Sequence, residues 1–465
     1  MPERLHETWI HSNRFIPRRF VRPIETFMSN EASSGIVLLL AAVAALVWAN
    51  APFGETYERF WSTELVIEIG GFHLAETLEA LVNDGLMAIF FFLVGLEIKR
   101  ELVLGELRDP KAAALPVMGA LGGMIFPALI FVALVAGQGG EALRGWGVPV
   151  ATDIAFSLGV LAVLGKRVPT GAKIFLLALA IADDLGGILV IALFYTSGLS
   201  FVWLGLGLAG LALIYLASKV GIRSYVFYTP MAFAVWFFFL ESGVHATIAG
   251  VALAFLTPAR PMYSVPEYDA KARRILDMYV PKGETQVQRE RSDFEAMMLA
   301  DIARESVSPL TRLEHRLQPW VAFGIIPIFA LANAGVRFEG SISDALLSRV
   351  ALGVALGLLV GKTVGISLFT WLAVRLGWGR LPRETTWRHI VGVAAVAGIG
   401  FTVALFIAAL AFTTPEFADE AKVGIFAGSI LAGLLGAGIF LTAPRAPQEP
   451  LAKEPPREEE VPVGT

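Results

Sequence analysis

The amino-acid sequence predicts an all-α membrane protein that crosses the lipid bilayer about twelve times. Its 465 residues are 55% hydrophobic and only 17% charged, whereas soluble domains carry roughly 25% charged residues. Apolar runs close to the roughly 20 residues that cross hydrocarbon recur along most of the chain. Arginine and lysine gather in alternate loops between these runs, as expected of a polytopic protein.

The apolar runs divide the chain into five parts. A segment at 1–32 precedes the first run, and spans one to eight occupy 33–257. A charged stretch at 258–319 separates them from spans nine to twelve at 320–442. We expect the polar tail at 443–465 to be disordered, because it has little apolar surface to bury. The expected spans are 33–50, 82–98, 113–136, 148–165, 174–196, 201–217, 225–240, 243–257, 320–336, 350–374, 390–412 and 421–442.

The basic residues orient these spans. An even number of spans places both termini on one side, and the loops on that side hold most of the arginine and lysine, which predicts cytoplasmic termini. These residues are Arg14, Arg18, Arg19, Arg22, Lys99, Arg100, Arg108, Lys111, Lys166, Arg167, Lys173, Lys219, Arg223, Arg375, Arg380, Arg383 and Arg388. The alternate loops hold little besides Arg59, Arg144, Arg337, Arg349 and Lys422.

Two connecting segments carry structural predictions of their own. In the external loop at 52–80, two short β-prone runs between Leu65 and Leu74 flank Gly70-Gly71, which is consistent equally with a β-hairpin and with an irregular loop. The cytoplasmic stretch contains two segments, Ala270–Met278 and Glu295–Glu305, that are compatible with short amphipathic helices. Its polar composition favours a solvated linker instead.

Composition also excludes several kinds of site. The chain has no cysteine, so disulfides, thiol nucleophiles and thiolate metal sites are excluded. The net charge is −4 and the basic residues form no stripe, so we expect no nucleic-acid partner.

We single out five ionisable residues inside the expected spans, where a charge at the bilayer centre costs roughly 2.5 to 3.5 kcal/mol on insertion scales. They are Asp84, Asp153, Asp183, Asp184 and Lys362. Charged groups at this depth usually mark an ion or proton pathway.

The adjacent aspartates in span five are the centre of the prediction. Neighbouring helix positions point about 100° apart, so Asp183 and Asp184 can face different partners. Lys362 in span ten needs an anion, and we expect it to pair with Asp183, leaving Asp184 for a cation. The alternatives are aspartates kept protonated for packing and a lysine that extends to the membrane surface.

Two spans contain matching interruptions. Glycine and proline in Gly147–Ala151 precede Thr152-Asp153 in span four, and Gly398–Thr402 interrupts span eleven. Paired breaks of this kind are typical of discontinuous helices that meet at a transporter's binding site. Close glycine packing without unwinding is the alternative.

Six motifs are spread from about residue 30 to 440: Val82–Met87, Leu93–Leu102, Ala151–Phe156, Ala182–Gly186, Ser242–Thr247 and Gly398–Thr402. In these motifs the chain resembles the NhaA-type bacterial sodium/proton antiporters. The resemblance implies a twelve-helix fold in which spans three to five and ten to twelve are inverted repeats, with spans four and eleven unwound where they cross. It also implies a multi-pass protein of the bacterial inner membrane.

The resemblance assigns roles to individual residues. It implies that Asp183 and Asp184 carry the ions, with Thr152 and Asp153 beside them and Lys362 as the buried counter-charge. It associates Glu97, Arg100, Glu101, Glu314 and His315 with the response to pH, and its motifs include Asp84 and His245, each of which is also compatible with a structural role. Two departures bear on regulation: the long stretch before Arg312–His315, and Gln318 where a second histidine would be familiar.

The expected activity is secondary antiport and not enzymatic catalysis. Sodium prefers oxygen ligands, and burial favours proton uptake by the same carboxylates, so Na⁺ and H⁺ compete for one site. The resemblance implies an electrogenic exchange of two protons for each Na⁺, with Li⁺ as a further cargo and no cofactor. The expected partners are Na⁺, H⁺ and the bilayer. The sequence leaves open whether the external hairpin near Leu65 to Leu74 joins two copies of the chain.

The sequence leaves several points open. It does not decide between Na⁺ and Li⁺ preference, the pH of activation, or whether Asp183 or Lys362 carries the second proton. Two other classes also use charges in membranes. An intramembrane aspartyl protease would need Asp153 as its second acid, and a passive cation channel would lack proton exchange.

Overall fold

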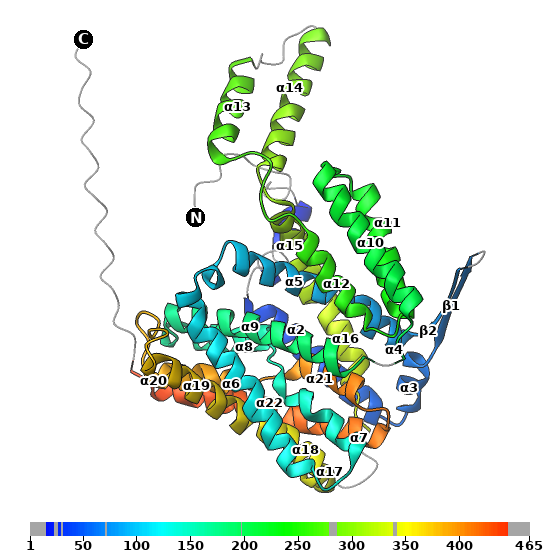
Figure 1. The fold of residues 1–465 in the computed structure, drawn as a ribbon, viewed down its shortest axis with the longest axis vertical. Helices are drawn as coiled ribbons and strands as arrows, with labels where there is room; N and C mark the ends of the chain where they lie inside the picture. The colour runs from blue at the N-terminus through cyan, green and yellow to red at the C-terminus, as the bar shows by residue number, and fades with distance from the viewer. Residues whose placement is uncertain are drawn as a thin grey trace.

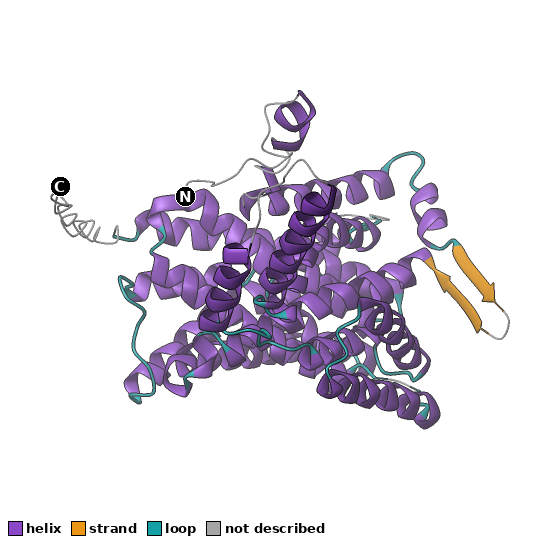
Figure 2. Ribbon diagram, turned by 90° about the horizontal axis from the view of Figure 1, so that it is seen from above, coloured by secondary structure: helices purple, strands orange, loops and turns teal. Residues whose placement is uncertain are grey.

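The computed structural model describes residues 15–22, 27–28, 31–69, 72–196, 198–278, 286–337 and 342–444. The described residues form a broad body of packed helices, from which one β-hairpin and one pair of helices project (Figures 1 and 2). The tail from residue 445, expected to be disordered, lies outside this description.

Seven helical segments of the described chain are long and apolar enough to cross a membrane. Each falls on an expected span, because an apolar run in hydrocarbon must satisfy its backbone hydrogen bonds internally. They are α2 (Glu31–Asn50), α4 with η3 and α5 (Leu78–Ala80, Leu81–Leu86, Met87–Val103), α6 (Pro110–Val135), α9 (Thr170–Phe194), α10 (Phe201–Val220), α18 with η8 and α19 (Arg349–Leu356, Gly357–Gly361, Lys362–Arg375) and α22 (Pro415–Thr442).

Two further spans are broken, at the two interruptions expected from the sequence. The segment Gly140–Val150 bends by 41° before Ile154–Arg167, and Trp387–Val396 bends by 46° before Phe401–Ala411. The elements are α7 (Gly140–Leu143), η5 (Arg144–Val150), α8 (Ile154–Leu164) and η6 (Gly165–Arg167) in the first span, and α20 (Trp387–Val396) and α21 (Phe401–Ala411) in the second. Counting each as one span gives up to nine in the described residues.

The remaining expected spans are shorter or more polar helices. The expected division after Glu241 is present, since α11 (Tyr225–Glu241) and α12 (Ala246–Leu256) are separate helices. Span nine corresponds to η7 (Val321–Ile325) and α16 (Ile326–Asn333), which continue the polar α15 (Pro309–Trp320). A polytopic helical membrane protein is therefore present, while the number twelve stays a prediction.

The loop expected at 52–80 contains a β-hairpin, one of the two forms expected for it. Strand β1 (Glu64–Ile69) pairs antiparallel with β2 (Phe72–Thr77), in a register that sets Glu64 opposite Thr77 and Ile69 opposite Phe72. Gly70 and Gly71 lie outside the described residues. The hairpin stands clear of the helical body (Figure 2).

The preference for a solvated linker at 258–319 was wrong. This stretch contains α13 (Val265–Met278) and α14 (Gln286–Glu305), which project together from the body (Figure 1). Both expected amphipathic segments lie inside these longer helices. The other short elements are η2 (Pro17–Val21), α3 (Glu55–Trp61), η4 (Glu106–Arg108) and α17 (Ile342–Leu347).

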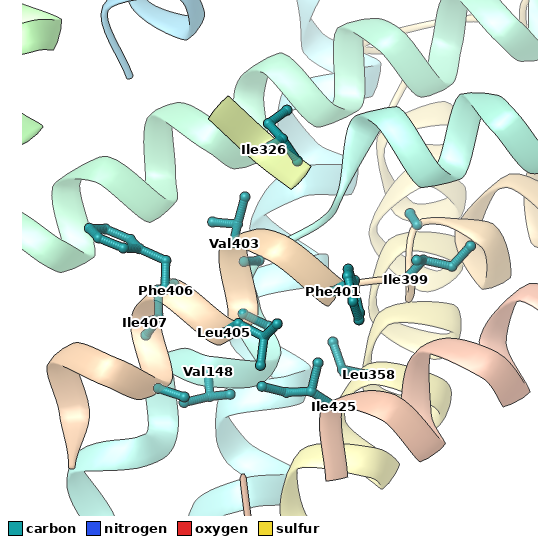
Figure 3. Close-up of a cluster of buried hydrophobic side chains, with 14 of the residues drawn as sticks. Val148, Ile326, Leu358, Ile399, Phe401, Val403, Leu405, Phe406, Ile407 and Ile425 are labelled. Carbon is teal, nitrogen blue, oxygen red and sulfur yellow. The ribbon is translucent and has the colours of Figure 1, made fainter. Parts of the chain in front are cut away.

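The hydrophobic core surrounds the two breaks. Side chains in and after the second break, including Ile399, Phe401 and Leu405, are buried against Leu358 and Ile425 (Figure 3). Outside the core, many apolar side chains on the spans are exposed, as expected where a helix contacts lipid tails. The fold thus packs the breaks tightly and holds them in one place.

Candidate ion-binding site

The expected ion pair between Lys362 and Asp183 is present. Lys362 Nζ lies 2.6 Å from Asp183 Oδ2, and the two residues are 0% and 3% exposed. Lys362 is the first residue of α19, and Asp183 lies midway along α9. The pair therefore joins two membrane spans far from either surface of the fold.

Thr152 connects this ion pair to the second broken span. Its hydroxyl accepts a hydrogen bond from Lys362 Nζ at 2.9 Å and donates one to the carbonyl oxygen of Ala397 at 2.8 Å. The unwound backbone after α20 frees that carbonyl, which a continuous helix would have used internally. Thr152, which lies in the first break, thus joins the two breaks by a hydrogen bond and also contacts Lys362.

Asp153 is a connector between the two breaks. Its N–H donates to Ile399 O at 2.6 Å. Its Oδ1 caps α8 by accepting from Phe156 N–H at 3.0 Å, while its Oδ2 accepts from Thr402 N–H at 3.0 Å and Thr402 Oγ1 at 2.6 Å. A carboxylate with three donors is held in place, and this geometry does not favour Asp153 as the second acid of a protease.

Glycine at the second break permits the close packing. A Cβ on Gly398 would collide with the carbonyl oxygen of Leu358. A Cβ on Gly400 would lie 2.8 Å from Leu358 Cδ2 and 3.0 Å from Ala151 O. The break can approach its neighbours only because both positions lack a side chain.

Asp184 remains available beside this network. It is partly exposed and makes no hydrogen bond or ion pair with the described residues. The charges that act on it are Asp183, Glu97, Lys362 and Asp153. Oδ1 of Asp183 is also buried without a hydrogen-bond partner. The arrangement offers unsatisfied acidic oxygens, which attract a cation or a proton.

A second charged group lies where α5 meets α15. Arg100 forms ion pairs with Glu314 and with Glu101, the latter at 3.5 Å. Glu97 lies in the electrostatic field of Glu314, Arg100 and Glu101. A cleft of about 780 Å³ opens beside Glu101. Four of the five residues assigned to the pH response are thus neighbours.

Three other expected residues lie outside both groups. His315 is exposed and has no polar partner in the described chain. Asp84 lies in η3, where its carbonyl oxygen accepts from Trp236 Nε1 at 2.8 Å. The Nε2 of His245 lies 2.8 Å from Tyr195 O, at the start of α12. The hydrogen bond of Asp84 thus involves its backbone carbonyl, and that of His245 involves its ring.

A family model described as Na⁺/H⁺ antiporter 1 matches residues 25–440 of the chain. The chain belongs to this antiporter family.

Curated members of the family are similar over nearly their whole length. The Na(+)/H(+) antiporter NhaA of Oleidesulfovibrio alaskensis is 46% identical over 90% of this chain and 93% of its own. The NhaA of an Anaeromyxobacter species is 47% identical over 93% and 94%. A solved structure, the sodium proton antiporter MjNhaP1 from Methanocaldococcus jannaschii, matches with a TM-score of 0.44 and 15% identity over 91% of this chain and 98% of that one. Its likeness is too low to inform the site.

Within this antiporter family fold, the site contains polar residues that the sequence did not single out. Thr402 donates twice to Asp153. Ser157 Oγ donates to Val396 O at 3.1 Å, and Ser429 Oγ accepts from Gly400 N–H at 3.3 Å. Thr152 lies inside the first break and Thr402 lies one residue into the helix that follows the second. A threonine at each break was the signal available in the sequence.

Proposed function

We propose that this chain is a secondary antiporter that exchanges Na⁺ for H⁺ across the bacterial inner membrane. The observation that carries the proposal is the buried Lys362–Asp183 pair, held by Thr152 between two broken spans, with the unpaired Asp184 beside it. Membership of an antiporter family supports the same activity.

The site residues perform exchange by competition. Asp184 binds the cation, and Asp183 Oδ1 and Thr152 Oγ1 are oxygens of the kind that a hard cation prefers. A proton neutralises the same carboxylate, so Na⁺ and H⁺ exclude one another. Because an uncompensated charge is costly inside the fold, the protein changes its accessible side only when the carboxylate is neutralised, and the proton gradient then drives Na⁺ out of the cell.

The cycle that we propose is electrogenic. Two protons enter for each Na⁺ or Li⁺ that leaves. Asp184 carries one proton, and the second belongs to the coupled Asp183–Lys362 pair. The charged form of Lys362 pairs with the Asp183 carboxylate. A cation bound at Asp184 is attracted by the same two carboxylates, so it competes with the ammonium group of Lys362.

The proposed topology has twelve spans with cytoplasmic termini. Inverted repeats comprise spans three to five and ten to twelve, with the two broken spans crossing at the site. The hydrogen bonds from Asp153 N–H to Ile399 O and from Thr152 to Ala397 O support such a crossing. The loop distribution of arginine and lysine supports the orientation.

We also propose that the charged group near α15 sets the response to pH. Glu97 interacts electrostatically both with Asp184 and with the ion-paired Arg100 and Glu314. A change in the charge of this group with cytoplasmic pH would alter the electrostatic potential at Asp184, because Glu97 interacts with both. His315 belongs to this proposal by its position next to Glu314 on α15.

The test is Na⁺-driven proton movement in proteoliposomes, followed with a pH-sensitive dye under an imposed voltage. Asp184→Asn removes the exchangeable charge at constant size, so we expect exchange to fall to the level of empty vesicles. Asp301→Asn, at an exposed position of α14, is the matched control and retains exchange. Sodium-dependent proton flux that survives in Asp184→Asn would refute the site, and a rate insensitive to voltage would refute the electrogenic cycle.

A further inference from the structure

His389 is a buried titratable residue that the proposed ion pathway does not use. It lies in the first turn of α20 and is 1% exposed. Its ring stacks on Phe440 near the end of α22, with centroids 6.1 Å apart and planes 15° from parallel. The histidine therefore sits between the start of one broken span and the end of the last span.

The hydrogen bonds of the ring fix its protonation state. Nδ1 accepts from the N–H of Thr386 at 3.1 Å, so it carries no proton. Nε2 then carries the proton and donates to the carbonyl oxygen of Pro444 at 3.2 Å. This is the neutral Nε2–H tautomer, and the bond from Thr386 is the reverse half of a capping box, in which the third helical residue accepts from the N-cap.

The helix that His389 anchors ends at the candidate site. From His389, α20 continues to Val396, and the next residues supply the carbonyl oxygens of Ala397 and Ile399. These oxygens accept from Thr152 and from the N–H of Asp153. The other broken span reaches the same anchor, because Arg167 donates to Leu441 O at 2.9 Å. The end of α22 thus holds the ends of both broken spans.

We propose that the neutral ring of His389 is a positioning residue for the second broken span, and that its protonation releases the start of α20 from its cap and so lowers ion exchange. The effect on exchange rests on the proposed function, whereas the effect on the cap does not. When Nδ1 takes a proton from solvent, its lone pair is lost, and the N–H of Thr386 has no acceptor there. The Thr386 hydroxyl, 3.3 Å from Nδ1, can accept from the new N–H but cannot replace the lost acceptor.

The surroundings oppose a positive ring. Most charged groups near the start of α20 are basic. They belong to the described elements packed around α20 or to the loop before it, and they are Lys173, Arg375, Arg380, Arg383, Glu384, Arg388 and Arg167. Glu384, the single acid among them, is exposed. The N-terminus of a helix also carries partial positive charge, which disfavours a cation in its first turn. Protonation of His389 therefore works against both the burial of its ring and the cap.

The test compares His389→Gln with His389→Ala in the full chain. Glutamine at this position keeps an acceptor for the capping box but cannot titrate, while alanine removes the acceptor. Unfolded histidine takes up a proton below about pH 6.5, so the wild type should lose thermal stability as pH falls through that value. His389→Gln should not show this part of the loss of thermal stability at acidic pH. His389→Ala should unfold at lower temperature at every pH, and the exposed His315→Gln should follow the wild type.

Exchange in proteoliposomes and nitrogen NMR of the histidine rings complete the test. We expect the pH below which exchange stops to be lower in His389→Gln than in the wild type. The NMR spectrum of the wild type should show the Nε2–H tautomer of His389 at neutral pH. Stability profiles of wild type and His389→Gln that coincide, or an Nδ1–H tautomer, would overturn the proposal. If the stability profiles differ as expected but no variant exchanges Na⁺ at any pH, the proposed function fails and the role of His389 at the cap stands.

Discussion

At the residue scale, the Lys362–Asp183 pair is a costly feature that the fold retains. Removing two charges from water costs several kcal/mol per ion, and the attraction between them often does no more than offset that cost. Two apolar side chains of similar size would pack as stably. The pair is therefore better explained by ion exchange, which needs charges that can be separated, than by stability.

The energetics of this pair can be tested by removing one partner. Lys362→Met should destabilise the protein by about 3–5 kcal/mol, because it leaves the Asp183 carboxylate buried and unpaired. The double variant Asp183→Leu, Lys362→Met should recover most of that loss. Thermal unfolding in detergent measures both. Lys422→Met, which breaks the partly exposed pair with Asp419, is the control and should cost at most about 1 kcal/mol. A single variant as stable as the double would contradict the prediction.

Residues differ in how far the sequence predicts their contacts. The Lys362–Asp183 pair was predictable, because a lysine deep in an apolar run needs an anion and few were available. The bonds between Asp153 and Thr402 were not, because they join residues 249 positions apart, and no local pattern specifies which donors reach a carboxylate. The exposed position of His315 was also not visible, since a helical turn has both a buried and an exposed side.

At the element scale, α13 and α14 show the limit of reading polar segments. Their polar composition is equally typical of a solvated linker and of an exposed helix, so composition alone favoured the wrong structure. The contacts that attach these two helices to the body lie next to it, before the start of α13 and at the end of α14. Glu305 pairs with Arg223, Met262 N–H donates to Glu305 O at 3.0 Å, and Arg304 lies over the Tyr225 ring. The segment that contains α13 and α14 thus leaves the helical body and returns to it at one place.

The short helix α3 is attached to the end of α16 by one hydroxyl group. Tyr57 is buried, lies within hydrogen-bonding distance of the carbonyl oxygens of Leu331 and Ala332 at 2.9 and 2.7 Å, and accepts from Gly335 N–H at 3.2 Å. Burial raises the pKa of the Tyr57 hydroxyl well above its ordinary value, so it stays protonated and able to donate at physiological pH.

Tyr57→Phe tests this attachment. The change removes the hydroxyl and leaves the Gly335 N–H without that acceptor, which should cost about 1–3 kcal/mol. Thermal unfolding is the measurement. Tyr215→Phe is the control, because Tyr215 is 48% exposed and its hydroxyl has no hydrogen-bond partner among the described residues. Equal melting temperatures for the two variants would show that the hydroxyl contributes nothing.

At the scale of the whole molecule, the two broken spans are tied together at both ends. At one end, Glu141 accepts hydrogen bonds from the backbone and hydroxyl groups of Thr413 and Thr414. At the other, Arg167 donates to Leu441 O near the end of α22, and His389 donates to Pro444 O two residues after it. Between these ends, the breaks bond to each other inside the core seen in Figure 3. Such fastening favours movement of the broken spans as one body.

The hairpin gives the molecule a surface suited to a second copy. Val66 on β1 is 54% exposed, with Leu65 and Ile67 beside it at 39% and 37%. A two-stranded sheet leaves unpaired backbone groups along both outer edges, and such edges pair readily with another strand. We therefore expect homodimers in which the hairpins contact each other. Val66→Glu should increase the monomer fraction at equal protein concentration, as measured by light scattering in detergent. Val265→Glu, at an 82% exposed position of α13, places the same charge elsewhere and should leave the dimer intact. A dimer that persists equally in both variants would place the contact between copies on another face.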